Sequence, residues 1–269
     1  MNIRENLDRF LVCGHRGYAG KYPENTMSGF IAAAELGVDL IEVDVVATKE
    51  GIPVICHDYE LDRTSDGHGL IADYTLDELR QFNMAAKSKL AVQPERICTF
   101  EEFCVFMQKY PDLMVNIDMK NDNGPTCHKV ADIVERFGYK DRVVFNGLGC
   151  KGLAEMHDRG FYVEGSHPNF YPTIDFEAMC SDGVKKVDAL CLNANQHINK
   201  ESVEFLRSFG VEVWGWCSNW DGMSECDDGT WIPVECESCM QNMLDNGITM
   251  SLCNHPDRCI KFLKEKGLR

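Results

Sequence analysis

Short apolar runs alternate with amphipathic segments along the whole chain, and this alternation restricts its possible folds more than any other feature. Such a pattern is typical of βα units around a parallel sheet. We expect eight strands, at Phe10–Cys13, Leu40–Val45, Leu113–Met119, Arg142–Phe145, Phe161–Val163, Val187–Leu192, Val211–Trp216 and Ile248–Leu252. Helices are expected at Met27–Leu36, Cys127–Phe137, Leu153–Arg159, Ile174–Val184, Ser202–Phe209, Cys239–Asn246 and Pro256–Lys264. The pattern predicts an α/β fold, a (β/α)8 TIM barrel, although an open doubly wound sheet has the same periodicity.

The distance between the second and third strands is too long for one crossover helix, which predicts an insertion at about residues 53–98. Two pairs of residues have capping-box spacing and predict helices there: Thr75 with Glu78, and Thr99 with Glu102. With 269 residues, the chain is otherwise of the size of one barrel, so we expect a single domain over residues 1–269. A second unusual stretch, Cys217–Glu237, fits no regular element well. It follows a barrel strand, so we expect it over the mouth of the barrel.

The formal charge of −16 disfavours nucleic acid and anionic membranes as partners, and a small anionic substrate would need a local cation. Glu5 and Asp8 interrupt the apolar run that a signal peptide would need near the start of the sequence. No apolar segment reaches membrane-spanning length. The 14 cysteines are scattered, which favours reduced thiols and a cytoplasmic location. A zinc site is the less favoured alternative for one crowded group: Cys217, Cys226, Cys236 and Cys239.

Acidic side chains alternate with apolar ones in two neighbouring expected strands. Glu42 and Asp44 share one face of the second strand, and Asp118 lies with Lys120 on one face of the third. All lie toward the carboxyl ends of their strands, where barrel active sites form. Three carboxylates suit Mg²⁺ or Ca²⁺ better than zinc, while pairing with a nearby Arg or Lys is the structural alternative. Burial inside apolar strands is costly for such acids, so we favour a metal site.

Two histidines are placed where a short apolar run meets a loop. His15 lies in Cys-Gly-His-Arg-Gly and His57 in Ile-Cys-His-Asp. Such a pair can supply a base for an attacking hydroxyl and an acid for a leaving oxygen. Arg16 and Lys120 are candidate cations for a phosphate, or partners of the acids themselves. The other histidines have no such setting, and we expect structural roles for them.

These motifs resemble the glycerophosphodiester phosphodiesterase family, one of the phosphodiesterase barrels similar to phosphatidylinositol phospholipase C. The resemblance covers nearly the whole chain, densely up to Lys120 and thinly after it. It is carried by His15-Arg16-Gly17, Pro23-Glu24-Asn25-Thr26, Glu42-x-Asp44, His57-Asp58, Leu61-Asp62-Arg63-Thr64 and Asn116-Ile117-Asp118-Met119-Lys120, with weaker matches at Trp214–Asn219 and Asn254-His255-Pro256.

The resemblance implies hydrolysis of a small-molecule glycerophosphodiester to sn-glycerol 3-phosphate and an alcohol. It implies the divalent cation at Glu42, Asp44 and Asp118, acid–base catalysis by His15 and His57, and phosphate contacts from Arg16 and Lys120. It leaves open the alcohol, the native ion and the oligomeric state. It also leaves open whether the glycerol hydroxyl attacks to form a cyclic phosphate or water attacks directly.

The chain departs from the family in two respects. Asp118 stands where the family usually has Glu, and the segment after the seventh strand is longer than usual. Spider-venom type phospholipases D, which act on lysophospholipids and can use Asp at the third metal position, are therefore the alternative enzyme. A catalytically silent barrel that binds a phosphorylated ligand is the alternative outside enzymes.

Overall fold

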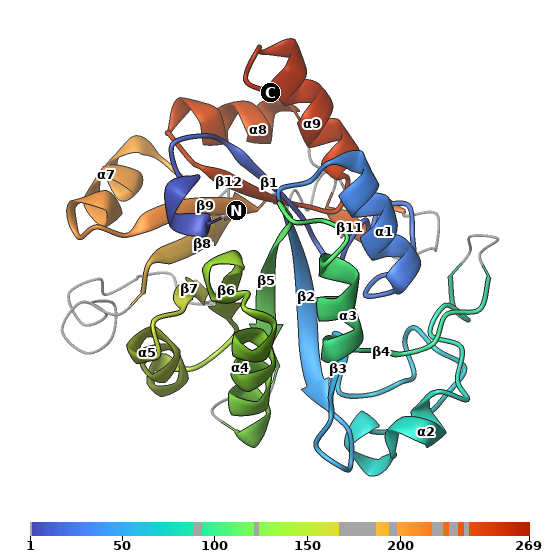
Figure 1. Ribbon diagram of the computed structural model, residues 1–269. Helices are drawn as coiled ribbons and strands as arrows, with labels where there is room; N and C mark the ends of the chain where they lie inside the picture. Colours follow the sequence, from blue (N-terminus) through green and yellow to red (C-terminus); the bar gives the residue numbers. More distant parts are fainter. Residues whose placement is uncertain are drawn as a thin grey trace.

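Eight parallel strands form a closed ring (Figure 1). The computed structural model describes residues 2–88, 93–120, 124–166, 187–193, 198–216, 223–225, 231–233 and 237–269. The ring runs β1 (Leu11–Gly14), β2 (Leu40–Ala47), β5 (Met114–Met119), β6 (Val143–Asn146), β7 (Tyr162–Ser166), β8 (Ala189–Asn193), β9 (Glu212–Trp216) and β12 (Met250–Cys253). Pairing of β1 with both β12 and β2 closes it. The predicted barrel is confirmed, and the open sheet is excluded.

Helices surround the ring, as the amphipathic segments predict (Figure 1). They are α1 (Met27–Leu36), α4 (Pro125–Phe137), α5 (Cys150–Asp158), α7 (Lys200–Ser208), α8 (Glu237–Asp245) and α9 (Pro256–Glu265), with 3-10 turns η1 (Ile3–Glu5) and η3 (Lys140–Arg142). The expected helix at Ile174–Val184 lies outside the described residues. Among those residues, none of the helices combines the length and the apolar character needed to cross a membrane.

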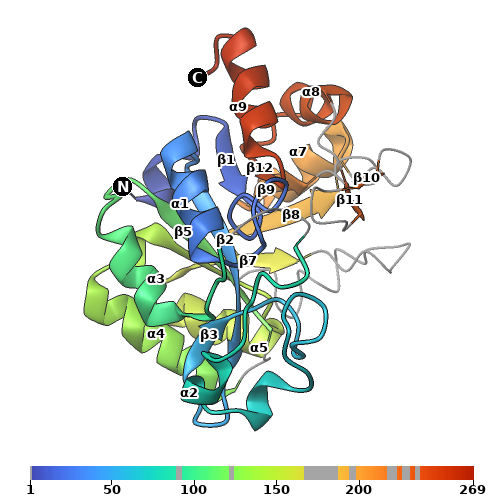
Figure 2. The same cartoon turned by 90° about the vertical axis from the view of Figure 1, so that its right-hand side faces the viewer.

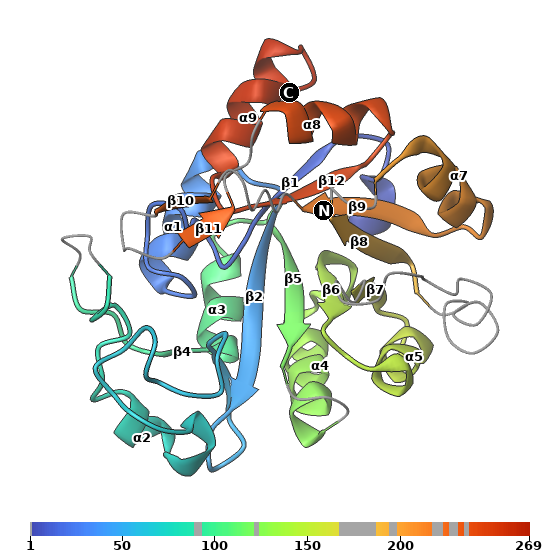
Figure 3. The same ribbon diagram turned by 180° about the vertical axis from the view of Figure 1, so that it is seen from behind.

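The predicted insertion leaves the ring after β2 and returns before β5. It contains β3 (Pro53–Ile55), the turn η2 (Ile71–Asp73), α2 (Leu76–Leu79) and β4 (Cys98–Thr99), after which α3 (Phe100–Met107) leads back to the barrel. Both predicted capping boxes are present, at the starts of α2 and α3. Figure 3 shows the insertion at one flank of the barrel, beside α3 and the end of β2.

The insertion has a hydrophobic cluster of its own, which we call the satellite core. Its buried members are Val46, Val54, Cys56, Leu61, Ile71, Leu79, Met84 and Ile97. Antiparallel pairing of β3 with the end of β2 attaches this unit to the barrel. The larger core lies between the ring and its helices, and a third cluster fills the ring interior around Trp214 and Met114. His57, two residues beyond β3, is thereby held against the open end of β2.

The expectation that Cys217–Glu237 holds no regular element is wrong, because the segment contains two short strands. β10 (Met223–Glu225) and β11 (Trp231–Pro233) form an antiparallel pair. Strands of three residues are too short for alternation to mark them in the sequence. Figure 2 shows this pair on the side toward which β7, β8 and β9 point. Apart from Glu237, which begins α8, the rest of the segment lies outside the described residues, as do Cys217, Cys226 and Cys236 of the less favoured zinc alternative.

Candidate active site

Three carboxylates gather where β2 and β5 end. Glu42 and Asp44 on β2 are buried, and Asp118 on β5 is half-buried and stands beside Asp44 in the strand register. One oxygen from each of the three lies within 4.8 Å of the others. The convergence expected from the alternation within each strand is therefore present. Carboxylate oxygens at this spacing are a donor set suited to a hard divalent cation.

The loop after β1 shapes this cluster through backbone and side-chain hydrogen bonds. The backbone N–H of Arg16 donates to Glu42 Oε2 at 2.8 Å, and Asn25 Nδ2 donates to Asp44 Oδ2 at 2.7 Å. Both residues have positive φ angles, 52° for Arg16 and 56° for Asn25. Residues other than glycine adopt this region at a cost that the surrounding structure must offset. Here the two buried acids are the partners that hold the loop in place.

Two cations border the acids. Lys120 Nζ lies 2.7 Å from Asp44 Oδ1 and 2.6 Å from Asp118 Oδ2, and Arg16 Nε lies 3.4 Å from Asp44 Oδ2. Asp44 Oδ1 is buried, and Lys120 Nζ is its ion-pair partner. Both expected phosphate cations thus pair with the cluster. A metal ion bound among the three carboxylates would take the place of Lys120 at this oxygen.

The pKa values of the acids diverge. Burial raises the pKa of Glu42 well above its ordinary value, and the negative charges of Asp44 and Asp118 add to the effect. Burial also acts on Asp44, but the cations Arg16 and Lys120 outweigh it and hold the pKa of Asp44 below its ordinary value. Glu42 therefore favours its protonated form beside the two other acids, and a metal ion bound to the cluster would take the place of that proton.

His15 stands at the end of β1, directly beside the acids. Its Nδ1 lies 2.7 Å from Asn254 Oδ1 at the end of β12, and its Nε2 lies 4.0 Å from Glu42 Oε2. Since the amide oxygen only accepts, Nδ1 carries the proton and Nε2 has a lone pair. Burial, together with the Arg16 charge, lowers the pKa of His15 to about 4. His15 is therefore neutral at pH 7 and can accept a proton at Nε2.

His57 belongs to the insertion and pairs with its neighbour in sequence. Its Nδ1 lies 2.6 Å from Asp58 Oδ1, and Arg63 Nε donates to the other Asp58 oxygen at 2.6 Å. Burial raises the pKa of Asp58, but hydrogen bonds from Arg63 and His57 outweigh it and lower that pKa. A carboxylate at Nδ1 fixes the orientation of the imidazole.

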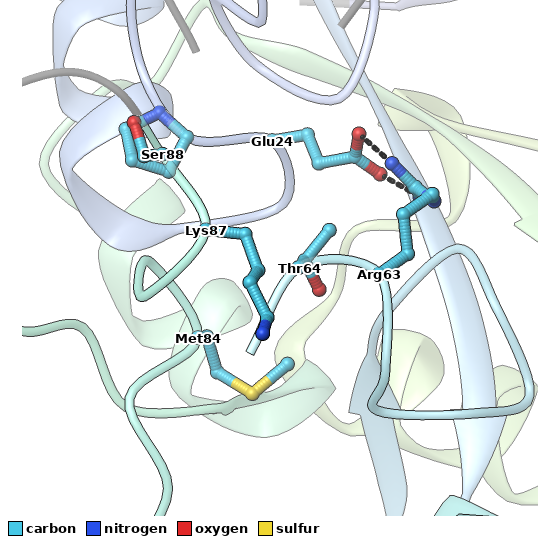
Figure 4. Close-up of a pocket in the computed structure, with 7 residues that line it drawn as sticks. Glu24, Arg63, Thr64, Met84, Lys87 and Ser88 are labelled. Atoms are coloured by element: carbon cyan, nitrogen blue, oxygen red, sulfur yellow. Dashed lines mark hydrogen bonds and ion pairs between the residues drawn. The ribbon is translucent and has the colours of Figure 1, made fainter. Parts of the chain in front are cut away.

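Arg63 connects the histidine of the insertion to the loop after β1. Arg63 donates to both oxygens of Glu24, at 2.7 and 2.6 Å (Figure 4). Glu24 also accepts from Arg16 at 2.9 Å. Despite burial, these two arginines lower the pKa of Glu24 to about 2. Charge-assisted bidentate pairs of this kind are among the stronger polar contacts in proteins. The network therefore fixes the insertion relative to the barrel end.

The positioning residues around the histidines were not predicted as such from the sequence. Asn254 could have been suspected because it directly follows a barrel strand, and Glu24 and Asn25 because they lie in a matched motif.

Among the remaining histidines, His68 pairs with Asp62 at the surface, and His255 is buried beside Gly20. His167 and His197 lie outside the described residues.

A buried glutamate that the sequence analysis did not single out lies below the site, inside the ring. Glu164 on β7 accepts from Asn116 Nδ2 at 2.5 Å. Burial raises its pKa to about 8, and the Asp118 charge adds to the shift. The ordinary value is 4.5, so between these limits the folded protein keeps a proton that the unfolded chain releases. Stability consequently falls as pH rises through this window.

We expect Glu164→Gln to remove this pH dependence. The amide can still accept from Asn116 but does not titrate. Between pH 4.5 and about 8, the free energy of unfolding of the variant should therefore rise relative to that of the wild type by about 1.4 kcal/mol per pH unit. Urea unfolding at pH 5, 6, 7 and 8 measures the difference. Parallel stability curves for the two proteins would contradict the assignment of a protonated Glu164.

Comparison with known proteins agrees with the barrel. The proteins that the chain resembles are phosphoric diester hydrolases. Residues 15–258 match the model of the glycerophosphoryl diester phosphodiesterase family, and the chain belongs to that family. It is 27% identical over 279 residues to a glycerophosphodiester phosphodiesterase of Bacillus altitudinis, covering 94% of this chain and 98% of that protein.

Solved structures show the same fold. A glycerophosphodiester phosphodiesterase from Agrobacterium tumefaciens is similar with a TM-score of 0.73 at 17% identity, over 92% of this chain and 97% of that one. A second similar structure is a phosphodiesterase from Oleispira antarctica, solved in complex with the product sn-glycerol-3-phosphate. Its TM-score is 0.74 at 20% identity, and the match covers 94% of this chain and 96% of that one.

Proposed function

We propose that this chain hydrolyses glycerophosphodiesters to sn-glycerol 3-phosphate and an alcohol, in a metal-dependent reaction with His15 and His57 as the acid–base pair. The observation that carries the proposal is the convergence of one oxygen each from Glu42, Asp44 and Asp118 to within 4.8 Å of one another, beside His15. The family membership of the chain supports the substrate class. The product named for the Oleispira antarctica structure supports glycerol 3-phosphate as the product here.

The acids Glu42, Asp44 and Asp118 would hold the cation, Mg²⁺ or Ca²⁺. All donors are oxygens, and two of the three residues are buried. When bound, such an ion polarises the phosphoryl oxygens. Lys120 and Arg16 would then be able to turn from the acids toward the anionic phosphate, which is the role proposed for them here.

The two histidines have different surroundings, and these suggest different roles. His15 Nε2 has a lone pair and would take the proton of the attacking hydroxyl, because Asn254 fixes the tautomer. His57, held by the carboxylate of Asp58, would give a proton to the oxygen of the leaving alcohol. The alcohol departs with that proton as the P–O bond to it breaks. If water is the attacking group, glycerol 3-phosphate forms directly; if the glycerol hydroxyl attacks, a water molecule then opens the cyclic phosphate.

Two alternatives are less favoured. A spider-venom type phospholipase D would act on lysophospholipids with the same barrel and histidines, but the Bacillus altitudinis relative is named for glycerophosphodiesters. A silent phospho-ligand-binding barrel would not need two histidines and three acids in one place. We therefore retain hydrolysis of a water-soluble diester as the proposed activity.

We expect the protein to release glycerol 3-phosphate and choline from glycerophosphocholine when Mg²⁺ or Ca²⁺ is present. A chelator should stop the reaction, and excess metal should restore it, because the acid cluster then regains its cation. An enzyme-coupled assay for glycerol 3-phosphate follows the product. Lysophosphatidylcholine is the comparison substrate: faster turnover of this lipid would favour the phospholipase, and turnover of neither would contradict both enzymatic proposals.

A further inference from the structure

A cavity of about 580 Å³ opens beside the proposed site, on the insertion side. Its wall includes His57 and Lys120, together with Tyr59, Glu60, Asp62 and Leu70. Pockets of a few hundred Å³ are of the size that takes small organic ligands. The cavity shares two residues with the proposed catalytic centre, and His57 is the group proposed to protonate the leaving oxygen. The cavity therefore lies next to the position that the leaving alcohol would occupy.

Hydrogen bonds within the insertion hold the wall of the cavity in place. Ile71 N–H donates to the carbonyl of Tyr59 at 2.8 Å, and Glu60 and Leu70 form an antiparallel bridge. The hydroxyl of Tyr59 donates to the carbonyl of Lys120, which joins the insertion to the end of β5. About half of the Tyr59 surface stays exposed, 51%. An aromatic ring is thus fixed at the cavity wall and accessible to a ligand.

The cations that line the cavity are already neutralised, whereas one of its acids is not. Lys120 pairs with Asp44 and Asp118, and Arg63 pairs with Asp58 and Glu24. No ion pair is recorded for Glu60 within the part of the chain that the structure describes. The partner of Asp62 is His68, an exposed imidazole. The remaining charge at the cavity is therefore negative, in a protein of formal charge −16.

We propose that this cavity binds the leaving alcohol and selects alcohols that carry a positive charge, with Glu60 and the ring of Tyr59 as the specificity determinants. The proposal rests on the proposed function. A quaternary ammonium or primary amine is attracted by a carboxylate and by the face of an aromatic ring. A neutral alcohol such as glycerol gains neither contact. Glycerophosphodiesters of amino alcohols are therefore the preferred substrate class.

The test compares glycerophosphocholine with glycerophosphoglycerol, which differ in the charge of the alcohol. The wild type should have the higher kcat/KM on the choline diester. Glu60→Gln removes the charge at nearly constant size and should lower the ratio of the two kcat/KM values by about three- to tenfold, mainly through KM. Raising the ionic strength should lower the wild-type ratio and leave that of the variant nearly constant.

Asp77→Asn is the matched control, because it removes one exposed carboxylate from α2 of the same insertion, outside the cavity. Its substrate ratio should equal that of the wild type. A wild type that hydrolyses both diesters without preferring choline, or an unchanged ratio in Glu60→Gln, overturns the inference while the proposed function stands. Hydrolysis of neither diester overturns the proposed function, and the inference with it.

Discussion

Alanine at His15 or at His57 is expected to lower kcat by about two to four orders of magnitude while the fold stays intact. Each histidine has one ring nitrogen engaged, by Asn254 or by Asp58, so each is oriented for proton transfer at its other nitrogen. Neither substitution removes a large part of a hydrophobic core. Steady-state rates on glycerophosphocholine with saturating metal measure the loss, and circular dichroism checks the fold.

Two other histidines supply controls for this pair. His68→Ala changes a surface residue of the same insertion, and His128→Ala changes an exposed residue of α4. Both should retain wild-type turnover. A variant of His15 or His57 with near wild-type kcat would remove that residue from the mechanism, and the remaining histidine would have to serve both proton transfers.

Asp118→Asn is expected to raise the metal concentration needed for half-maximal activity by about 10- to 100-fold. The change removes the charge of one proposed ligand at constant size. Excess metal should recover part of the activity, because Glu42 and Asp44 remain. Metal titrations of activity in wild type and variant measure the shift, and Asp77→Asn serves again as the control for the loss of one charge.

Close packing of Gly147 restricts the position of the Asp118 side chain. A Cβ at Gly147, whose φ is +73°, would lie 2.0 Å from Asp118 Oδ1, so the backbone after β6 packs directly against this carboxylate. The side chain therefore has a defined position beside Asp44 rather than a free choice of rotamers. Unchanged metal dependence in Asp118→Asn would show that the ligand role proposed for this position is wrong.

Local patterns in the sequence predicted the barrel and its acid cluster. Glu42 and Asp44 alternate with buried apolar residues, and the alternation alone places the two acids on the same face of the strand. Glu164 was not predicted, because the expected strand at Phe161–Val163 ended one residue before it. The contacts of Arg63 with Glu24 join residues 39 apart in the sequence. The periodicity of apolar residues within one helix or strand cannot predict a contact between such distant positions.

The satellite core also bears on how such an enzyme can change during evolution. The proposed recognition of the alcohol and the histidine that releases it belong to a unit with its own hydrophobic cluster, whereas the carboxylates and His15 belong to the ring. Tyr59, Glu60, Asp62 and Leu70 of the cavity wall lie in the insertion, next in sequence to Leu61 and Ile71 of the satellite core or separated from them by one residue. Preference for one alcohol or another can therefore drift at these positions while the carboxylates and His15 are inherited unchanged.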